Sequence, residues 1–146
     1  MTKGLTKDEL SQLCYLDKEI KYLKRQIERL SYEIQNVNQI ISDTPKGSNN
    51  QNKTESIAID LADYKSLLEV NVRRYWQEKE KIERFIGSLE DSKLRLIMRL
   101  RYINGLRWQE IAFEIGHYDE SYPRRLHNKF LKNINRADYA DSSVIN

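Results

Sequence analysis

Residues 100–116 read LRYINGLRWQEIAFEIG, and this stretch decides the fold class of the chain. Gly105 interrupts one amphipathic pattern and Gly116 ends the next, since glycine readily adopts the left-handed backbone that closes a helix. Ala112 stands one turn before Gly116, so the short helix is thin where a second helix can cross it. A basic segment, residues 123–132, follows. This order predicts a helix-turn-helix whose second helix offers polar and basic side chains to a DNA groove.

The predicted helix-turn-helix domain covers residues 88–136. Pro123 must lie in the first turn of the last helix, because a proline placed deeper would cost about 3 kcal/mol. We therefore expect this helix to begin with Ser121 as its cap and to end near Asn135. The tail at residues 137–146 is predicted to be frayed.

The last helix is predicted to have two distinct faces. The inward face is expected to carry the apolar residues that recur every four positions, namely Tyr122, Leu126, Phe130 and Ile134. On the opposite face, arginine suits bidentate contact with guanine, asparagine suits adenine, and lysine meets phosphates. With two residues from the preceding segment, the predicted DNA-contacting set is Arg107, Tyr118, Ser121, Arg124, Arg125, Asn128, Lys129 and Lys132. The alternative is that the cations only keep this face solvated.

The basic charge of the chain is concentrated in the same domain. The 146 residues carry a formal net charge of +3, whereas residues 89–136 contain ten basic and six acidic residues. A local excess of positive charge is what a polyanion such as double-stranded DNA requires of a partner. Charge alone slightly favours the plainer interpretation of a solvated helix face.

The composition is typical of a helix-rich protein with no membrane span. Charged residues make up 32% of the chain and the mean hydropathy is −0.77, and no apolar run is long enough to cross a bilayer. Cys14 is the single cysteine, so no disulfide can form within the chain. The first nine residues are polar and charged, unlike a secretory signal. We therefore expect a cytoplasmic protein.

A heptad pattern runs through the first forty or so residues, in which apolar residues alternate in steps of three and four. It predicts a helix of roughly 50 Å, which begins at a capping box formed by Thr6 and Glu9. Such a seam needs a partner helix to cover it. Its members are Leu13, Leu16, Ile20, Leu23, Ile27, Leu30, Ile34, Val37 and Ile41. The six from Leu16 to Ile34 are the predicted hairpin core.

A second long helix is predicted after a polar loop at residues 42–53, with its cap at residues 52–55. Asn71 and Glu78 interrupt its seam, whose apolar members are Ile57, Leu61, Tyr64, Leu68, Tyr75, Ile82, Phe85 and Leu89. A second apolar surface comprises Leu67, Val70, Val72, Trp76 and Ile86. Residues 1–87 are therefore predicted to form an antiparallel hairpin that also makes the protein a homo-oligomer, although the hairpin covers the first seam without a second subunit.

Residues 89–134 resemble region 4 of bacterial sigma factors and related phage regulators. The residues that carry the resemblance are Leu100–Arg101–Tyr102, Gly105, Trp108, Glu110–Ile111–Ala112, Ile115–Gly116 and Arg124–Arg125–Leu126. The layout of the whole chain is similar to the RinA/ArpU group of phage late-gene regulators, through residues 44–48 and 52–55. The resemblance implies an all-α, non-enzymatic protein that binds double-stranded DNA in a bacterial host. It also implies that the protein activates phage packaging and structural genes, with host RNA polymerase as a further candidate partner.

Two other classes of protein stay open as interpretations. A small terminase subunit also combines a helix-turn-helix with coiled coils, although its DNA-binding domain usually comes first. A module that binds RNA polymerase or a repressor would account for the acidic Asp119 and Glu120, which stand where the sigma-like pattern has polar or basic residues.

No catalytic or metal-binding constellation is found in the sequence. His117 and His127 have no cysteine or acidic residue at metal-ligand spacing, so we interpret both as surface or DNA-backbone histidines. The five glycines form no phosphate-binding loop. We therefore expect no enzymatic activity, no metal and no cofactor.

Overall fold

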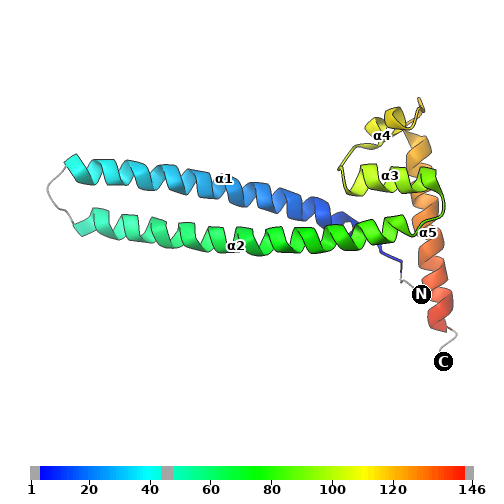
Figure 1. The fold of residues 1–146 in the computed structure, drawn as a ribbon, viewed down its shortest axis with the longest axis horizontal. Helices are drawn as coiled ribbons and strands as arrows, with labels where there is room; N and C mark the ends of the chain where they lie inside the picture. Colours follow the sequence, from blue (N-terminus) through cyan, green and yellow to red (C-terminus); the bar gives the residue numbers. More distant parts are fainter. Residues whose placement is uncertain (1–3, 44–47, 144–146) are drawn as a thin grey trace. The chain divides into compact units, whose positions relative to one another are not determined.

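The computed structural model describes residues 4–43 and 48–143, with side chains described at residues 4–40 and 51–136. Within these ranges the chain is all-α and contains no strand. Its helices are α1 (Lys7–Asp43), α2 (Ser48–Gly87), α3 (Ser92–Tyr102), α4 (Trp108–Glu114) and α5 (Ser121–Ser143) (Figure 1). The long hairpin of α1 and α2 precedes a helix-turn-helix formed by α4 and α5, so the predicted fold class is confirmed.

The chain divides into two compact units. The hairpin unit is Leu16–Tyr75, and the helix-turn-helix unit combines Met1–Tyr15 with Trp76–Asn146. The second unit is therefore larger than the domain predicted at residues 88–136, because it includes the start of α1 and the end of α2.

The hairpin unit packs the predicted seam of α1 against α2. Leu30, Val37 and Ile57 form a buried cluster, and Ile34, Leu61 and Tyr64 pack against it. Of the other predicted core residues, Ile20 and Leu23 are buried, whereas Leu16 and Ile27 are half-buried. The side chain of Ile41 lies outside the described residues. The heptad spacing thus correctly identified the face along which the two helices meet.

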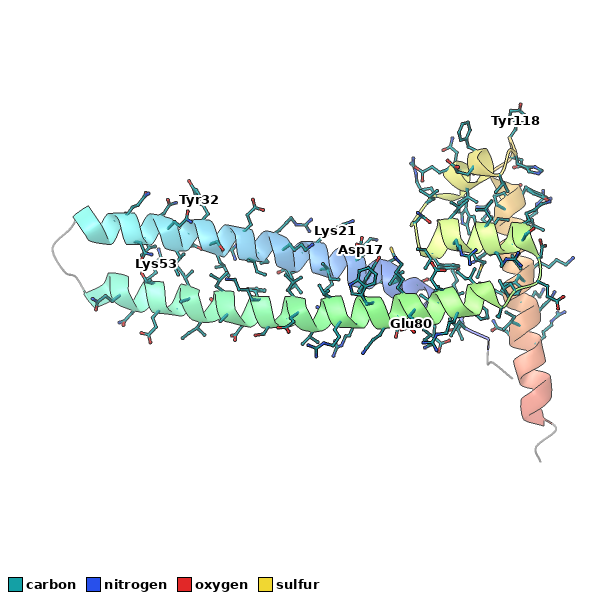
Figure 2. The ribbon with its side chains drawn as sticks, viewed as in Figure 1. Asp17, Lys21, Tyr32, Lys53, Glu80 and Tyr118 are labelled. Atoms are coloured by element: carbon teal, nitrogen blue, oxygen red, sulfur yellow. The ribbon has the colours of Figure 1, made fainter. Side chains whose placement is uncertain are left out.

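In the hairpin unit, α2 has a buried polar side chain and an exposed apolar pair. Asn71 is buried in the seam, with 3% of its surface exposed. Leu67 and Val70, from the predicted second apolar surface, are exposed one turn apart. On α1, the side chain of Tyr32 points away from α2 (Figure 2). The hairpin therefore leaves apolar surface on α2 that its own packing does not use.

The helix ends confirm one prediction and correct three. Thr6 and Glu9 form the predicted capping box: the Thr6 N–H donates to Glu9 Oε2 at 2.8 Å, and the Glu9 N–H donates to Thr6 Oγ1 at 3.2 Å. The loop predicted at residues 42–53 was too long, because α1 reaches Asp43 and α2 begins at Ser48. Serine and asparagine lower helix propensity by only tenths of a kcal/mol each, which does not end a helix.

The predicted start of the second long helix and the predicted end of the last helix are the other two corrections. Residues 52–55, predicted as a cap, are internal to α2. The helix α5 continues to Ser143 rather than ending near Asn135, since no glycine or proline follows Arg136 to stop it. Residues 144–146 of the predicted tail lie outside the described part of the chain.

The helix-turn-helix unit has a core to which every one of its helices contributes. Its buried residues are Leu5, Leu10, Leu13, Ile82, Ile86, Ile97, Met98, Tyr102, Ile111, Ala112, Pro123, His127 and Leu131. The rings of Phe85 on α2 and Phe130 on α5 lie 6.3 Å apart. Arg99 on α3 pairs with Glu83 on α2 at 3.3 Å. The short helices α3–α5 therefore complete their core with the two ends of the hairpin helices, which explains why the unit is larger than predicted.

Candidate nucleic-acid interface

Two glycines shape the helix-turn-helix as the sequence predicts. Gly105 after α3 has a φ of 68° and Gly116 after α4 has a φ of 79°, in the left-handed region that side chains disfavour. Past Gly116, the His117 N–H donates to the Ala112 carbonyl at 2.8 Å, and the Gly116 N–H donates to the Phe113 carbonyl at 3.1 Å. These two bonds form a Schellman motif, which fixes the direction in which the chain leaves α4.

Asp119, and not Ser121, supplies the side chain that caps α5. Asp119 Oδ1 accepts from the Ser121 N–H at 3.0 Å, and Oδ2 accepts from the Ser121 hydroxyl at 2.7 Å. Ser121 is the first residue of the helix, and Pro123 lies in the first turn as predicted. The hydrogen bonds from Ser121 lower the pKa of the Asp119 carboxyl, so this group is charged at neutral pH. The prediction of Ser121 as the cap was wrong because Ser121 is already the first residue of the helix, and the Asp119 carboxylate accepts from its N–H.

The outer face of α5 carries the cations and the amide that the sequence predicts for it. The exposed residues are Arg124, Arg125, Asn128, Lys129 and Lys132, whereas Ser121 is half-buried. Their spacing puts them on the side opposite the buried row of the helix. The predicted residues of α5 are therefore brought together on one surface, apart from the hydroxyl of Ser121, which bonds to Asp119.

The remaining two predicted residues flank α4. Arg107 is exposed just before α4, where its N–H donates to Glu110 Oε2 at 2.9 Å and its guanidinium to Oε1 at 3.2 Å. These bonds lower the pKa of the Glu110 carboxyl. Tyr118 is fully exposed in the turn and points away from the helices (Figure 2). Arg107 is thus paired within the chain, while the ring of Tyr118 projects into solvent.

The inward face of α5 is centred one position further along than predicted. Tyr122, Leu126, Phe130 and Ile134 are only half-buried. The buried row is Pro123, His127 and Leu131, with the predicted residues beside it. Both rows repeat every four residues, so the spacing alone could not decide between them, and the apolar residue types favoured the row that borders the core.

The burial of His127 contradicts its interpretation from the sequence. Only 1% of its surface is exposed, so it is a core residue and not a surface or DNA-backbone histidine. Its Nε2 hydrogen-bonds to the hydroxyl of Tyr102, and its Nδ1 lies 2.9 Å from Asn128 Oδ1. Burial lowers the pKa of His127 and raises that of Tyr102 to about 12, so both groups are neutral at physiological pH.

Aromatic rings from α3 and α4 pack against this histidine of α5. The Trp108 ring of α4 lies 4.8 Å from the His127 ring, and the Tyr102 ring of α3 lies 5.5 Å from it. The guanidinium of Arg101 stands over the Trp108 ring at 4.5 Å. Because histidine is polar, hydrophobic periodicity did not identify His127 as a core residue. The sequence signal for its burial was its i, i+4 spacing with Pro123 and Leu131.

The other histidine is exposed, as the sequence predicts. The His117 ring stacks on Tyr122 at 3.9 Å with an interplanar angle of 19°. The ammonium of Lys93 on α3 donates to the Tyr122 hydroxyl at 3.0 Å, and this hydrogen bond raises the pKa of Lys93. These contacts connect the turn before α5 to α3.

Phe113 on α4, which was not predicted to be a functional residue, is 82% exposed. It borders a shallow hollow of about 660 Å³, together with Arg107, Glu110 and Tyr118. The signal was present in the sequence, because the buried residues of α4 share a face that excludes position 113. Phe113 and Tyr118 are thus two exposed aromatic residues that line the same hollow.

Comparison with models of protein families, with curated proteins and with solved structures finds no match to this chain. The resemblance to sigma region 4 and to the RinA/ArpU group therefore stays a prediction from the residues. Among the described residues, no group of three or more histidine, cysteine or acidic side chains could hold a metal ion. No helix in the described ranges is long and apolar enough to cross a membrane.

Proposed function

We propose that this protein is a sequence-specific DNA-binding transcription regulator of a phage or prophage, acting in the bacterial cytoplasm. The observation that carries the proposal is the row of exposed arginine, asparagine and lysine side chains on α5, directly after the α4–α5 turn. A second helix that follows a Schellman turn and has a basic outer face is the arrangement that enters a major groove. By its resemblance to late-gene regulators, the protein would activate packaging and structural genes.

The exposed residues divide naturally by chemistry into base and phosphate contacts. Arg124, Arg125 and Asn128 lie in the first two turns of α5, the part of a recognition helix that meets base edges. Lys129 and Lys132 follow further along, where flexible ammonium groups suit phosphates. Tyr118 supports a contact with the sugar-phosphate backbone because it projects from the turn itself.

Self-association would give the protein two such helices. The exposed Leu67 and Val70 on α2 support an additional helix contact in the hairpin unit. A two-fold dimer would recognise two half-sites that are related by the same symmetry.

The proposal is tested by measuring binding to duplex DNA from the protein's own genomic neighbourhood across a salt series. The Arg124→Ala/Arg125→Ala variant is expected to lose most of the affinity, with a salt slope shallower by up to about two. The matched control is Arg73→Ala/Arg74→Ala, which removes an equally exposed arginine pair from α2. Absence of specific binding by the folded wild type, or an equal loss in the control, would overturn the proposal.

A second candidate function is a module that binds RNA polymerase or a repressor, and the exposed Phe113 favours it. Phe113→Ala should then leave DNA affinity unchanged and abolish activation in a transcription reaction reconstituted with host polymerase. Lost activation with intact DNA binding would assign the α4 surface to a protein partner. Unchanged activation would remove this candidate.

A further inference from the structure

The side chain of Asn128 is held by the buried histidine beside it. Asn128 is exposed on the outer face of α5, yet its Oδ1 lies 2.9 Å from the Nδ1 of His127, which belongs to the core. An amide oxygen only accepts hydrogen bonds, so the proton of this bond is on His127 Nδ1. The bond therefore fixes which end of the amide faces inward: the oxygen is turned to His127 and the Nδ2 amino group is left for solvent or a ligand.

The partner on the other side of the ring sustains the same arrangement. A neutral imidazole carries one proton, so Nε2 has none when Nδ1 has it, and Nε2 accepts from the Tyr102 hydroxyl. Tyr102 is buried and keeps its proton, since burial raises its pKa to about 12. A single directed chain thus runs from the Tyr102 hydroxyl through the His127 ring to the Asn128 oxygen, across α3 and α5.

This direction matters for which base edge Asn128 can contact. An unconstrained asparagine pairs with adenine by accepting from N6 and donating to N7. Asn128 has its oxygen committed to His127, so it presents chiefly donors. Among the base edges of the major groove, guanine offers two adjacent acceptors, N7 and O6, and no donor.

We propose that Tyr102 and His127 act as positioning residues that turn the amino group of Asn128 toward the DNA, so that Asn128 selects guanine over adenine at one position of the DNA site. The inference rests on the proposed function and deepens it, because it names the edge that α5 reads at that position. It reverses the adenine contact that the residue type alone predicts.

The hydrogen-bond chain is tested first without DNA. In the protein labelled with ¹⁵N-histidine, long-range proton–nitrogen correlation spectra distinguish the two neutral tautomers of each ring. We expect His127 to be the Nδ1–H tautomer, which is the minor form in free histidine, and the exposed His117 to serve as the internal reference. A spectrum with His127 protonated on Nε2 would overturn the inference whatever the protein binds.

The preference of Asn128 for guanine is tested by selecting DNA from a random duplex library with three proteins. The wild type should select a guanine whose replacement by 7-deazaguanine, which lacks the N7 acceptor, weakens binding about tenfold or more. Asn128→Asp keeps the acceptor for His127 but has no donor, so this variant should lose the guanine preference at that position alone. The control Lys129→Ala should weaken binding at every sequence alike, with the preference intact.

A substitution at Tyr102, the buried end of the hydrogen-bond chain, distinguishes a positioning role from a merely structural one, because only a positioning role changes the base preference. Tyr102→Phe removes the hydroxyl that holds the proton on Nδ1, so the Asn128 amide is free to turn and adenine should be accepted alongside guanine. Its melting temperature, measured in parallel, separates this change from unfolding. A specific wild type whose guanine preference survives Asn128→Asp would overturn the inference and leave the proposed function standing. A wild type without specific binding would remove both, while the tautomer spectrum still reports on the hydrogen-bond chain.

Discussion

The Asp119 carboxylate lies 3.7 Å from the Arg125 guanidinium, at the start of α5. Both side chains are exposed, so the pair contributes little to the stability of the fold. Asp119 also occupies the N–H and the hydroxyl of Ser121. The N-terminus of a helix otherwise attracts phosphate groups, so this aspartate stands where a DNA phosphate would be favoured.

Removing the charge of Asp119 should therefore strengthen DNA binding. Asp119→Asn keeps an oxygen for the Ser121 N–H and frees Arg125, and we expect the affinity to rise about two- to fivefold in a fluorescence titration. The control Glu120→Gln removes the neighbouring charge without touching the cap, and should have a smaller effect. Equal gains from both variants would mean that general repulsion, and not the pairing with Arg125, limits affinity.

The stability of the helix-turn-helix unit should depend on the charge state of His127. Burial lowers its pKa below the ordinary value of 6.5, so the unfolded chain binds a proton more readily than the folded one as pH falls. The contribution is complete above about pH 6.5 and is lost progressively below it. Urea unfolding between pH 7.5 and 5.5 should show a falling free energy of unfolding. A flat profile for the wild type would contradict the burial of a neutral ring.

The hairpin unit should depend on the seam and not on its outer surface. Leu30→Ala removes a buried side chain from the cluster with Val37 and Ile57, and should destabilise the protein by about 2–4 kcal/mol. Tyr32→Ala, two residues away on the outside of α1, should change stability by less than about 0.5 kcal/mol. Urea titrations of both variants check this. Similar effects from the two would mean that α1 packs on another face.

Asn71 should hold the hairpin in register at a cost in stability. A buried amide in an apolar seam is less favourable than a leucine by about 1–2 kcal/mol, but it penalises misaligned pairings. Asn71→Leu is therefore expected to raise the melting temperature and to broaden the distribution of oligomers seen by light scattering. A lower melting temperature would show that the amide makes a net stabilising contribution in the seam.

The sequence predicted the elements that depend on periodicity and on glycine. The seam of α1, the two left-handed glycines and the outer face of α5 each follow from local rules that tertiary packing did not override. The helix boundaries at Ser48 and Ser143 do not follow from such rules. Weak helix formers and the absence of a stop signal change the free energy of helix formation only slightly at these positions.

The buried side of the candidate interface was harder to predict for a different reason. A histidine in a core is acceptable only when both ring nitrogens find partners, and those partners, Tyr102 and Asn128, lie 25 residues and one residue away. No local sequence pattern indicates a hydrogen bond between residues so far apart in the sequence. Phe113 was different, since its position off the buried face of α4 could have been deduced from the sequence.

The division of the chain has a consequence for how such proteins diversify. The helix-turn-helix unit is discontinuous in sequence, with residues 16–75 inserted between its two segments. An insertion built as a two-helix arm can gain or lose seven residues from each helix in step, because every heptad repeats the same seam. The length of the hairpin unit can therefore change without altering the residues that form the core of the other unit. An alignment that treats the last third of the chain as a self-standing domain would leave out residues 4–15, although they belong to the same compact unit.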